Sequence, residues 1–311
     1  MNNRKYFLTW FIFSLLVVAG CQGSIRNLPE GVSFFRTEIA LAELEWLPNN
    51  LQIVGTSPAL PLSGINVGRS PSEVYVWDST SNNLNQISDE AFSYWSGHPV
   101  WHPNLDLVMY FSIDEFGEDY KLGAIDSSGN IIIKLDGKNA DWIPNKNEIL
   151  VNRISHLSLF DTETQTYQTV WRTEKGWGIS EVAVSPSGQE VAILISDGSP
   201  VTHVLVMNLS QGEAQKIYES QMNISQISWG GSGNELLFLT SGTFNELWAI
   251  SVDGQCITKP FVFGYEFEDV TWSPDGEVIA ASTNDEVTGI FLLNTNSDLI
   301  QDWLTARSCQ L

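Results

Sequence analysis

Several carboxylates in the second half of the chain could carry out acid–base chemistry. Glu181 lies near Trp177, and Glu266, Glu268 and Asp269 lie together in a segment rich in Phe and Tyr. Enzymes that hydrolyse glycosidic bonds use two carboxyl groups about 5 to 9.5 Å apart, one of them as the acid. A pair from this set would make the protein an enzyme that acts on a glycan of the cell envelope.

The other catalytic and metal-binding patterns do not fit the sequence. No G-x-S-x-G nucleophile motif occurs in it. His98 and His102 are the closest histidines, but four residues of a strand separate them by about 13 Å, too far to share a metal ion. The acidic segment 114–119 lacks the spacing of an EF-hand loop. We therefore expect no catalytic residue of these classes, no metal and no cofactor.

A short phrase recurs six times along the chain and indicates the elements that position these residues. In each copy an aromatic or aliphatic residue closes a strand, a turn with Pro, Asn or Gly follows, and an apolar segment comes next. The copies lie 41 to 55 residues apart, and a period of roughly 40 to 50 residues is typical of propeller blades. They are Trp46-Leu47-Pro48-Asn49, Trp101-His102-Pro103-Asn104, Trp142-Ile143-Pro144-Asn145, Val184-Ser185-Pro186-Ser187, Trp229-Gly230-Gly231-Ser232 and Trp272-Ser273-Pro274-Asp275.

The hydrophobic pattern divides each repeat into strands. Residues 224–229 alternate between apolar and polar, as expected of a half-buried inner strand. Residues 235–240 are nearly all apolar, which favours a second strand covered on both faces. Further strands are expected at 246–251 and 256–261. The same pattern in the other copies predicts an all-β fold over residues 43–311, a six-bladed β-propeller of four-stranded antiparallel blades.

The turn sequences resemble those of a known family of propellers. Trp272-Ser273-Pro274-Asp275-Gly276, with residues 184–188 as a weaker copy, resembles the WD40-like repeats of TolB-type propellers. The resemblance covers nearly the whole mature chain and implies the fold, although a fold alone does not assign a function. We expect no separate N-terminal α/β domain of the TolB kind, so the specific partners of that family are not carried over.

The amino-terminal sequence is typical of a signal peptide. Two basic residues precede an apolar segment, residues 6–19, which is shorter than the ~20 residues of a membrane-spanning helix. The segment ends in Leu-Val-Val-Ala-Gly-Cys at residues 16–21, which resembles the lipobox of bacterial lipoproteins. The resemblance implies that residues 1–20 are removed and that Cys21 carries the lipid, including a palmitate chain.

This lipoprotein resemblance also predicts where the protein acts. A lipid on Cys21 would anchor it to the cell membrane or the outer membrane, facing the extracytoplasmic space. Gln22 follows the cysteine and favours the outer membrane. Residues 21–42 would then form the lipidated terminus and a tether. An uncleaved hydrophobic anchor is the alternative, and it places the propeller on the same side of the membrane.

Two further cysteines are left once Cys21 is lipidated. Disulfides persist in extracytoplasmic proteins, so Cys256 and Cys309 could be bridged if their Cα atoms lie within ~7 Å. We expect Cys256 in the outermost strand of the fifth blade and Cys309 just past the outermost strand of the sixth. Two separate thiols, with Cys256 buried in its strand, fit the sequence equally well.

The charge balance excludes one class of partner. The chain has 15 basic and 37 acidic residues and a formal net charge of −22. A protein this acidic does not neutralise the phosphates of nucleic acids and does not adsorb on anionic lipid. Membrane attachment is therefore expected through the lipid, and the acidity itself is explained by solubility.

The loops on one face of the ring supply the candidate partner-binding residues. In TolB-like propellers, the connections from one blade's outer strand to the next blade's inner strand gather on one face. Aromatic residues mixed with carboxylates, as found there, are typical of protein interfaces and of sugar platforms. The candidates are Trp95, His98, Trp177, Tyr265, Glu266 and Phe267. The alternative is that about half of such aromatic residues pack between blades.

These observations together predict a function. The sequence favours a membrane-anchored extracytoplasmic propeller that acts as a non-catalytic protein-binding or scaffold module of the cell envelope. Its partner would be an envelope protein of unknown identity, and not a nucleic acid. The alternative is a glycan-binding protein or a glycan-acting enzyme that uses carboxylates at the central face of the propeller.

Overall fold

A computed structural model describes the propeller and the carboxy-terminal tail. It covers residues 28–57, 73–87, 95–102, 107–113, 120–126, 131–242, 245–261, 264–284 and 287–309. Cys21 and the expected signal peptide lie outside these residues. None of the helices within them is long and apolar enough to cross a membrane.

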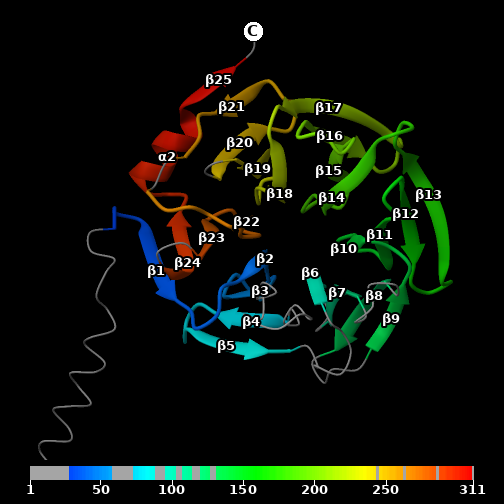
Figure 1. Cartoon of the computed structure of the whole chain (residues 1–311), viewed down its shortest axis with the longest axis horizontal. Coiled ribbons are helices and arrows are strands. Elements are labelled where there is room, and N and C mark those ends of the chain that lie inside the picture. Colours follow the sequence, from blue (N-terminus) through cyan, green and yellow to red (C-terminus); the bar gives the residue numbers. More distant parts are fainter. Residues whose placement is uncertain are drawn as a thin grey trace, which may run out of the picture.

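The first three sheets follow the repeat in chain order, from the inside of the ring outward (Figure 1). Blade one is β2 (Ala42–Trp46), β3 (Gln52–Thr56), β4 (Val74–Asp78) and β5 (Asn83–Gln86). Blade two is β6 (Trp95–Trp101), β7 (Leu107–Ile113), β8 (Tyr120–Asp126) and β9 (Ile131–Leu135). Blade three is β10 (Asn139–Trp142), β11 (Glu148–Asn152), β12 (His156–Asp161) and β13 (Thr166–Arg172).

The other three sheets complete the ring and include both ends of the described chain. Blade four is β14 (Gly178–Val184), β15 (Glu190–Ser196), β16 (Thr202–Asn208) and β17 (Glu213–Ser220). Blade five is β18 (Asn223–Trp229), β19 (Glu235–Ser241), β20 (Glu246–Ser251), β21 (Cys256–Thr258) and β25 (Arg307–Cys309). Blade six is β22 (Asp269–Trp272), β23 (Val278–Asn284), β24 (Thr288–Asn294) and β1 (Val32–Arg36). The predicted fold class, a six-bladed propeller of antiparallel blades, is confirmed.

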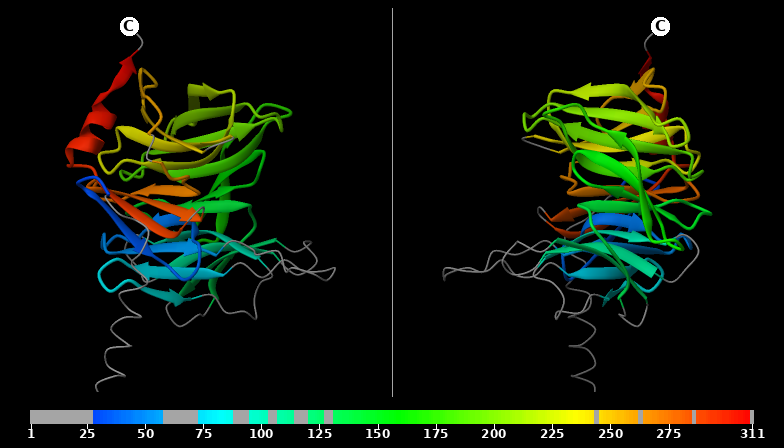
Figure 2. Two further views of the ribbon diagram at one scale, coloured as in Figure 1. Left: turned by 60° about the vertical axis from the view of Figure 1, so that its left-hand side comes forward. Right: turned by 90° about the vertical axis from the view of Figure 1, so that its right-hand side faces the viewer.

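Each innermost strand contacts the innermost strand of the next blade, so the ring is closed. The contacts run from β2 through β6, β10, β14, β18 and β22 and back to β2. Figure 1 looks down the axis of this ring, and Figure 2 shows the same blades from two other sides. The second strands are the most deeply buried, because the faces of neighbouring blades cover both of their sides.

In the copies that the structure describes in full, the repeated phrase forms the turn that follows the innermost strand. In blade six, Asp275 Oδ1 accepts hydrogen bonds from Ser273 Oγ at 2.6 Å and from the Glu277 N–H at 3.0 Å. Gly276 has φ +77°, a left-handed conformation that glycine adopts without strain. Ser185 and Gly188 repeat this arrangement in blade four. The phrase therefore specifies a tight turn, which is why it recurs with the blade period.

The ring is closed by a strand from the amino-terminal side. β1 pairs along β24, from Val32 opposite Leu293 to Arg36 opposite Gly289, as the fourth strand of blade six. Gly289 leaves no room for a side chain against the Phe35 backbone, which allows this close approach. Because β1 lies within 21–42, the segment expected to be terminus and tether also contributes a blade strand. The expectation that blade six takes its outermost strand from the carboxy-terminal side is wrong.

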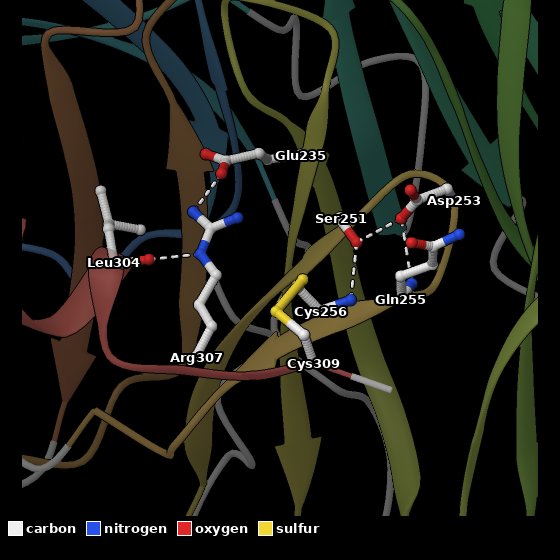
Figure 3. The surroundings of a disulfide bond; sticks show 8 residues. All are labelled: Glu235, Ser251, Asp253, Gln255, Cys256, Leu304, Arg307 and Cys309. Carbon is white, nitrogen blue, oxygen red and sulfur yellow. Dashed lines mark hydrogen bonds and ion pairs between the residues drawn. A yellow bond between two sulfur atoms is a disulfide. The ribbon is translucent and has the colours of Figure 1, made fainter. Parts of the chain in front are cut away.

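The carboxy-terminal tail folds back onto blade five. Helix α2 (Asp298–Thr305) buries Ile300, Trp303 and Leu304 in the apolar cluster between blades five and six. β25 then pairs with β21 and places Cys309 opposite Cys256. The two cysteines form a disulfide with Cα atoms 4.1 Å apart, and Arg307 in the same strand forms an ion pair with Glu235 (Figure 3).

Candidate binding site in the central channel

The six innermost strands end around a cavity of about 340 Å³ on the axis of the ring. Its wall consists of the residues that close these strands and of the turns after them, so all six copies of the repeated phrase contribute. Aromatic rings and prolines dominate the lining: Trp46, Trp101, Trp142, Trp229, Trp272, Pro48, Pro144, Pro186 and Pro274. We call this the tryptophan cavity. Because the ends of all six strands meet in it, the strands run through the ring in one direction.

A second, narrower cavity of about 60 Å³ continues the channel toward the middle of the same strands. Glu45, Val100, Asp141, Ala183 and Ile227 line both cavities, so the two form one continuous channel. The narrow part is strongly polar, because its lining includes acidic and amide residues: Glu43, Glu45, Asn139, Asp141, Glu181 and Gln226. The channel thus has an aromatic mouth and an acidic interior.

Three of the inner-strand carboxylates join neighbouring blades. Asp269 Oδ2 in blade six accepts the Leu44 N–H of blade one at 2.6 Å. Asp141 Oδ2 in blade three accepts the Val184 N–H of blade four at 2.6 Å. Each bond satisfies a backbone donor that the channel would otherwise leave unpaired, which stabilises the ring.

Glu181 makes the third bond of this kind. Its Oε1 atom in blade four accepts the Ile227 N–H of blade five at 3.3 Å. Burial and the nearby charge of Asp269 raise the pKa of Glu181 well above its usual value. Burial likewise raises the pKa of Asp269, against the effect of its hydrogen bonds to Leu44 and Val270.

Glu45 differs from these carboxylates because it has no such bond. Within the part of the chain that the structure describes, its carboxyl group has no hydrogen-bond partner, and it lies where the two cavities meet. Burial raises its pKa to about 8, and the charges of Asp141 and Asp269 add to the rise. Burial raises the pKa of Asp141 to about 6. Glu45 therefore holds its proton at neutral pH, where a carboxyl group in water would be ionised.

Two more polar groups of the channel wall are buried without a partner. Asn139 is 3 % exposed, and its Oδ1 atom accepts no hydrogen bond within the described residues, although its amide nitrogen donates to the Ser180 carbonyl. Trp142 is 4 % exposed, and its Nε1–H group has no acceptor there. Native proteins satisfy nearly all buried polar groups, so unpaired ones beside a cavity indicate room for a polar ligand or water.

A local irregularity of the backbone shapes this part of the channel. The pairing of β2 with β3 shifts register between Ala42 and Glu45, and Glu43 has φ +53°. A bulge re-aims side chains, and such bulges are common beside functional sites. Glu43 and Glu45 are two residues apart and both line the narrow cavity, as Asn139 and Asp141 do in β10.

Solved structures similar to this chain share its architecture. A putative TolB from Agrobacterium tumefaciens aligns with a TM-score of 0.62 and 13% identity, over 85% of this chain and 97% of that one. The Cps50 (Swd1) β-propeller domain of Myceliophteria thermophila aligns with a TM-score of 0.55 and 10% identity, over 85% and 99% of the chains. The likeness shows the fold.

An enzyme is also among the similar structures. An oligogalacturonate lyase in complex with manganese aligns with a TM-score of 0.52 and 10% identity, over 88% of this chain and 93% of that one. A comparison with protein-family models and one with curated protein sequences find no match. These structures therefore show the β-propeller fold alone.

Most of the candidate residues predicted from the sequence lie near the opposite ends of the innermost strands, whereas His98 lies in the middle of β6. Phe267 is 2 % exposed and packs against Phe291 in the cluster between blades five and six, so it is a core residue and its assignment to a partner-binding surface is wrong. Tyr265 is half-buried against the same Phe291 ring, at 4.9 Å between centroids. Glu266 is half-buried, and its Oε1 atom accepts the Asn245 N–H.

The other candidates are Trp177, in the loop before β14, and two residues of β6. Trp177 is half-buried and stacks on His203, with ring centroids 4.4 Å apart. Trp95 and His98 belong to β6, and the described part of these two residues is the backbone. Trp177, Tyr265 and Glu266 thus lie near one end of the ring, before β14 and β22, and part of their surface is used in contacts with other residues of the propeller.

The carboxylates considered for a glycan-acting enzyme are divided by the fold. Glu181 and Asp269 lie inside the ring, and both hold N–H groups of a neighbouring blade. Glu268 is exposed outside it. No group of three or more His, Cys, Asp or Glu in the described residues could hold a metal ion. Joining the blades accounts for the two buried carboxylates without acid–base chemistry.

Proposed function

We propose that the protein is a lipid-anchored extracytoplasmic propeller that binds a partner protein of the cell envelope at the tryptophan cavity. The observation that carries the proposal is the convergence of all six repeats on one aromatic, proline-lined cavity of about 340 Å³. Concave sites of this size, mostly apolar with a few polar groups inside, are the usual form of a binding site. Tryptophan is also enriched among residues that dominate the energy of protein interfaces.

Two observations support a location outside the cytoplasm. The sequence at residues 16–21 resembles a lipobox, and it follows a segment typical of a signal peptide. The Cys256–Cys309 disulfide suits an oxidising compartment, since such bonds are rare in the cytosol of most organisms. On this proposal, the tether after Cys21 leads directly into β1 and holds the propeller near the membrane surface.

Replacing Cys21 with serine should release the protein from the membrane. The lipid supplies the only strong attachment in this proposal, because a chain with a net charge of −22 is repelled by anionic lipid. Fractionation of cells that express Cys21→Ser should show the protein in the soluble fraction or as an unprocessed precursor. A variant that stays in the membrane and is still fully processed would exclude lipid anchoring.

Crosslinking in intact cells should identify which end of the ring binds the partner. Pro48 is exposed at the rim of the tryptophan cavity, and Lys175 is exposed in the loop before β14 at the opposite end of the innermost strands. A photoreactive amino acid at position 48 should give a crosslinked product with another protein, and one at position 175 should not. The reverse result would move the binding site to the candidate loop face. No product from either position would contradict a protein-binding function.

A further inference from the structure

We infer that the channel receives a basic side chain of the partner, an arginine or a lysine, which passes between the tryptophan rings and pairs with Glu45. This inference rests on the proposed function and names the chemistry of its ligand. It is carried by three observations on the channel: the unpaired carboxyl group, the aromatic rings above it, and the buried polar atoms beside it.

The first observation is the position of Glu45. Its carboxyl group lies where the tryptophan cavity narrows, and it has no hydrogen-bond partner among the described residues. Asp141 lines both cavities with it but already accepts the Val184 N–H. A guanidinium or ammonium group at this point would neutralise Glu45 and would also lie near Asp141. A buried carboxylate is stabilised by such a pair.

The second observation is the approach to Glu45. A basic side chain reaches it past Trp46, Trp142 and Trp229, whose residues line the wider cavity together with prolines. Cations are attracted to the faces of tryptophan rings, and the apolar stem of Arg or Lys is well accommodated by apolar walls. An anionic ligand is disfavoured here by the carboxylates at the inner end.

The third observation is the set of unpaired atoms in the wall. Asn139 Oδ1 is a buried acceptor without a donor, and it lines the narrow cavity next to Asp141. A guanidinium or ammonium group carries several donors and no acceptor, so it can satisfy this atom and a carboxylate together. A neutral ligand would leave the charge of an ionised Glu45 unpaired.

Among the side chains that the structure describes, the charged and titratable groups around Glu45 come from four of the six innermost strands. They are Glu43 on β2 itself, Asp141 on β10, Glu181 on β14 and Asp269 on β22, with Lys138 just before β10. The residues of β6 and β18 that line the narrow cavity are Pro99, Val100, Gln226 and Ile227, which carry no charge. Lys138 donates to the Ser180 carbonyl and acts on Glu181.

Binding of a cation should be linked to the loss of a proton from Glu45. Its raised pKa of about 8 means that the free channel is mostly protonated at neutral pH. The cation prefers the ionised carboxylate, so its affinity should rise by up to about tenfold per pH unit between pH 6 and pH 8, and level off above that. A neutral sugar or peptide would show no such dependence.

The test uses two short peptides and the folded protein. Acetyl-Gly-Arg-Gly-amide should change the tryptophan fluorescence saturably, and the citrulline peptide, which has the same shape without the charge, should bind at least tenfold more weakly. Glu45→Gln should weaken the arginine peptide about tenfold at pH 8 and remove the pH dependence between pH 7 and pH 8, where Asp141 is already mostly ionised. Glu277→Gln removes an exposed carboxylate from the turn after β22 and should leave the affinity unchanged.

Two outcomes would overturn the inference. Equal binding of the arginine and citrulline peptides would show that the channel does not select a cation, and an affinity that is flat in pH would show that Glu45 does not take part. Both measurements use the unaltered protein, so they remain decisive even if Glu45→Gln does not fold. Either outcome can occur while crosslinking from position 48 succeeds, and the failure of this inference is thus distinct from failure of the proposed function.

Discussion

Replacing Phe267 with alanine should lower the free energy of unfolding by about 3 to 5 kcal/mol. The side chain is 2 % exposed and belongs to the cluster that joins blades five and six, where it packs against the Phe291 ring. Its removal leaves a cavity that the two rigid sheets cannot fill by moving together. Urea denaturation followed by tryptophan fluorescence measures the change.

Tyr265→Ala is the matched control for this variant. Tyr265 also packs on Phe291 but is only half-buried, so its loss should cost clearly less than that of Phe267. A loss below about 1 kcal/mol for Phe267→Ala would show that this residue does not belong to the core and would restore it to the candidate binding surface.

Removing the Cys256–Cys309 disulfide should have an effect of similar size. The bridge encloses 53 residues of sequence, which include the whole of β22, β23, β24 and α2. Constraining a loop of this length in the unfolded chain stabilises the folded state by roughly 4 kcal/mol on the chain-entropy model. The double variant Cys256→Ser, Cys309→Ser should lose about that amount in urea denaturation without a reducing agent.

Two controls accompany the disulfide variant. Dithiothreitol should destabilise the unaltered protein toward the double variant and leave the double variant unchanged. Thiol titration of the denatured, unreduced mature protein should find neither cysteine free. Two free thiols, or a double variant as stable as the unaltered protein, would contradict a bridge in the native protein.

The strands that the sequence predicts best are those whose pattern is local. In the fifth repeat the strand at 246–251 is found with its predicted bounds, and the strands predicted at 224–229 and 235–240 differ by one residue at one end. A continuous apolar segment followed by a turn signal is enough to locate a strand covered on both faces. The repeat then supplies the number of blades, because each copy must bury its faces against a neighbour.

The closure of the ring depends on pairing between distant segments, which a local pattern does not contain. β1 has the composition of an ordinary short strand, and its partner β24 lies at the other end of the sequence. Likewise, α2 and β25 follow blade six in sequence but return to blade five. Cys256 and Cys309 were the one signal in the sequence that the tail and blade five could meet.

The channel could have been found by aligning the repeats as columns. Glu45 and Asp141 directly precede the tryptophan that closes their strands, and a polar residue stands three positions before the closing residue in every copy. These six residues are Glu43, His98, Asn139, Glu181, Gln226 and Asp269. The aromatic residues of the loops give a stronger signal in the sequence than these six polar residues. Alternation along β2 also places Glu43 and Glu45, which are two residues apart, on the same face of the strand, whereas the register shift between Ala42 and Glu45 has no signal in the local pattern.

The position of β1 gives the proposed anchor a mechanical role. On a chain held by a lipid at Cys21, any tension between membrane and bound partner enters the propeller at Val32, the first residue of the strand that closes the ring. The load would act first on the β1–β24 ladder, because β1 is the outermost strand of blade six, whereas the tail that follows β24 is fixed to blade five by the Cys256–Cys309 disulfide. Peeling β1 away would expose an unpaired edge on β24, and such an edge can accept a strand from another chain. Tensile force on the amino-terminal segment would then be able to open the ring.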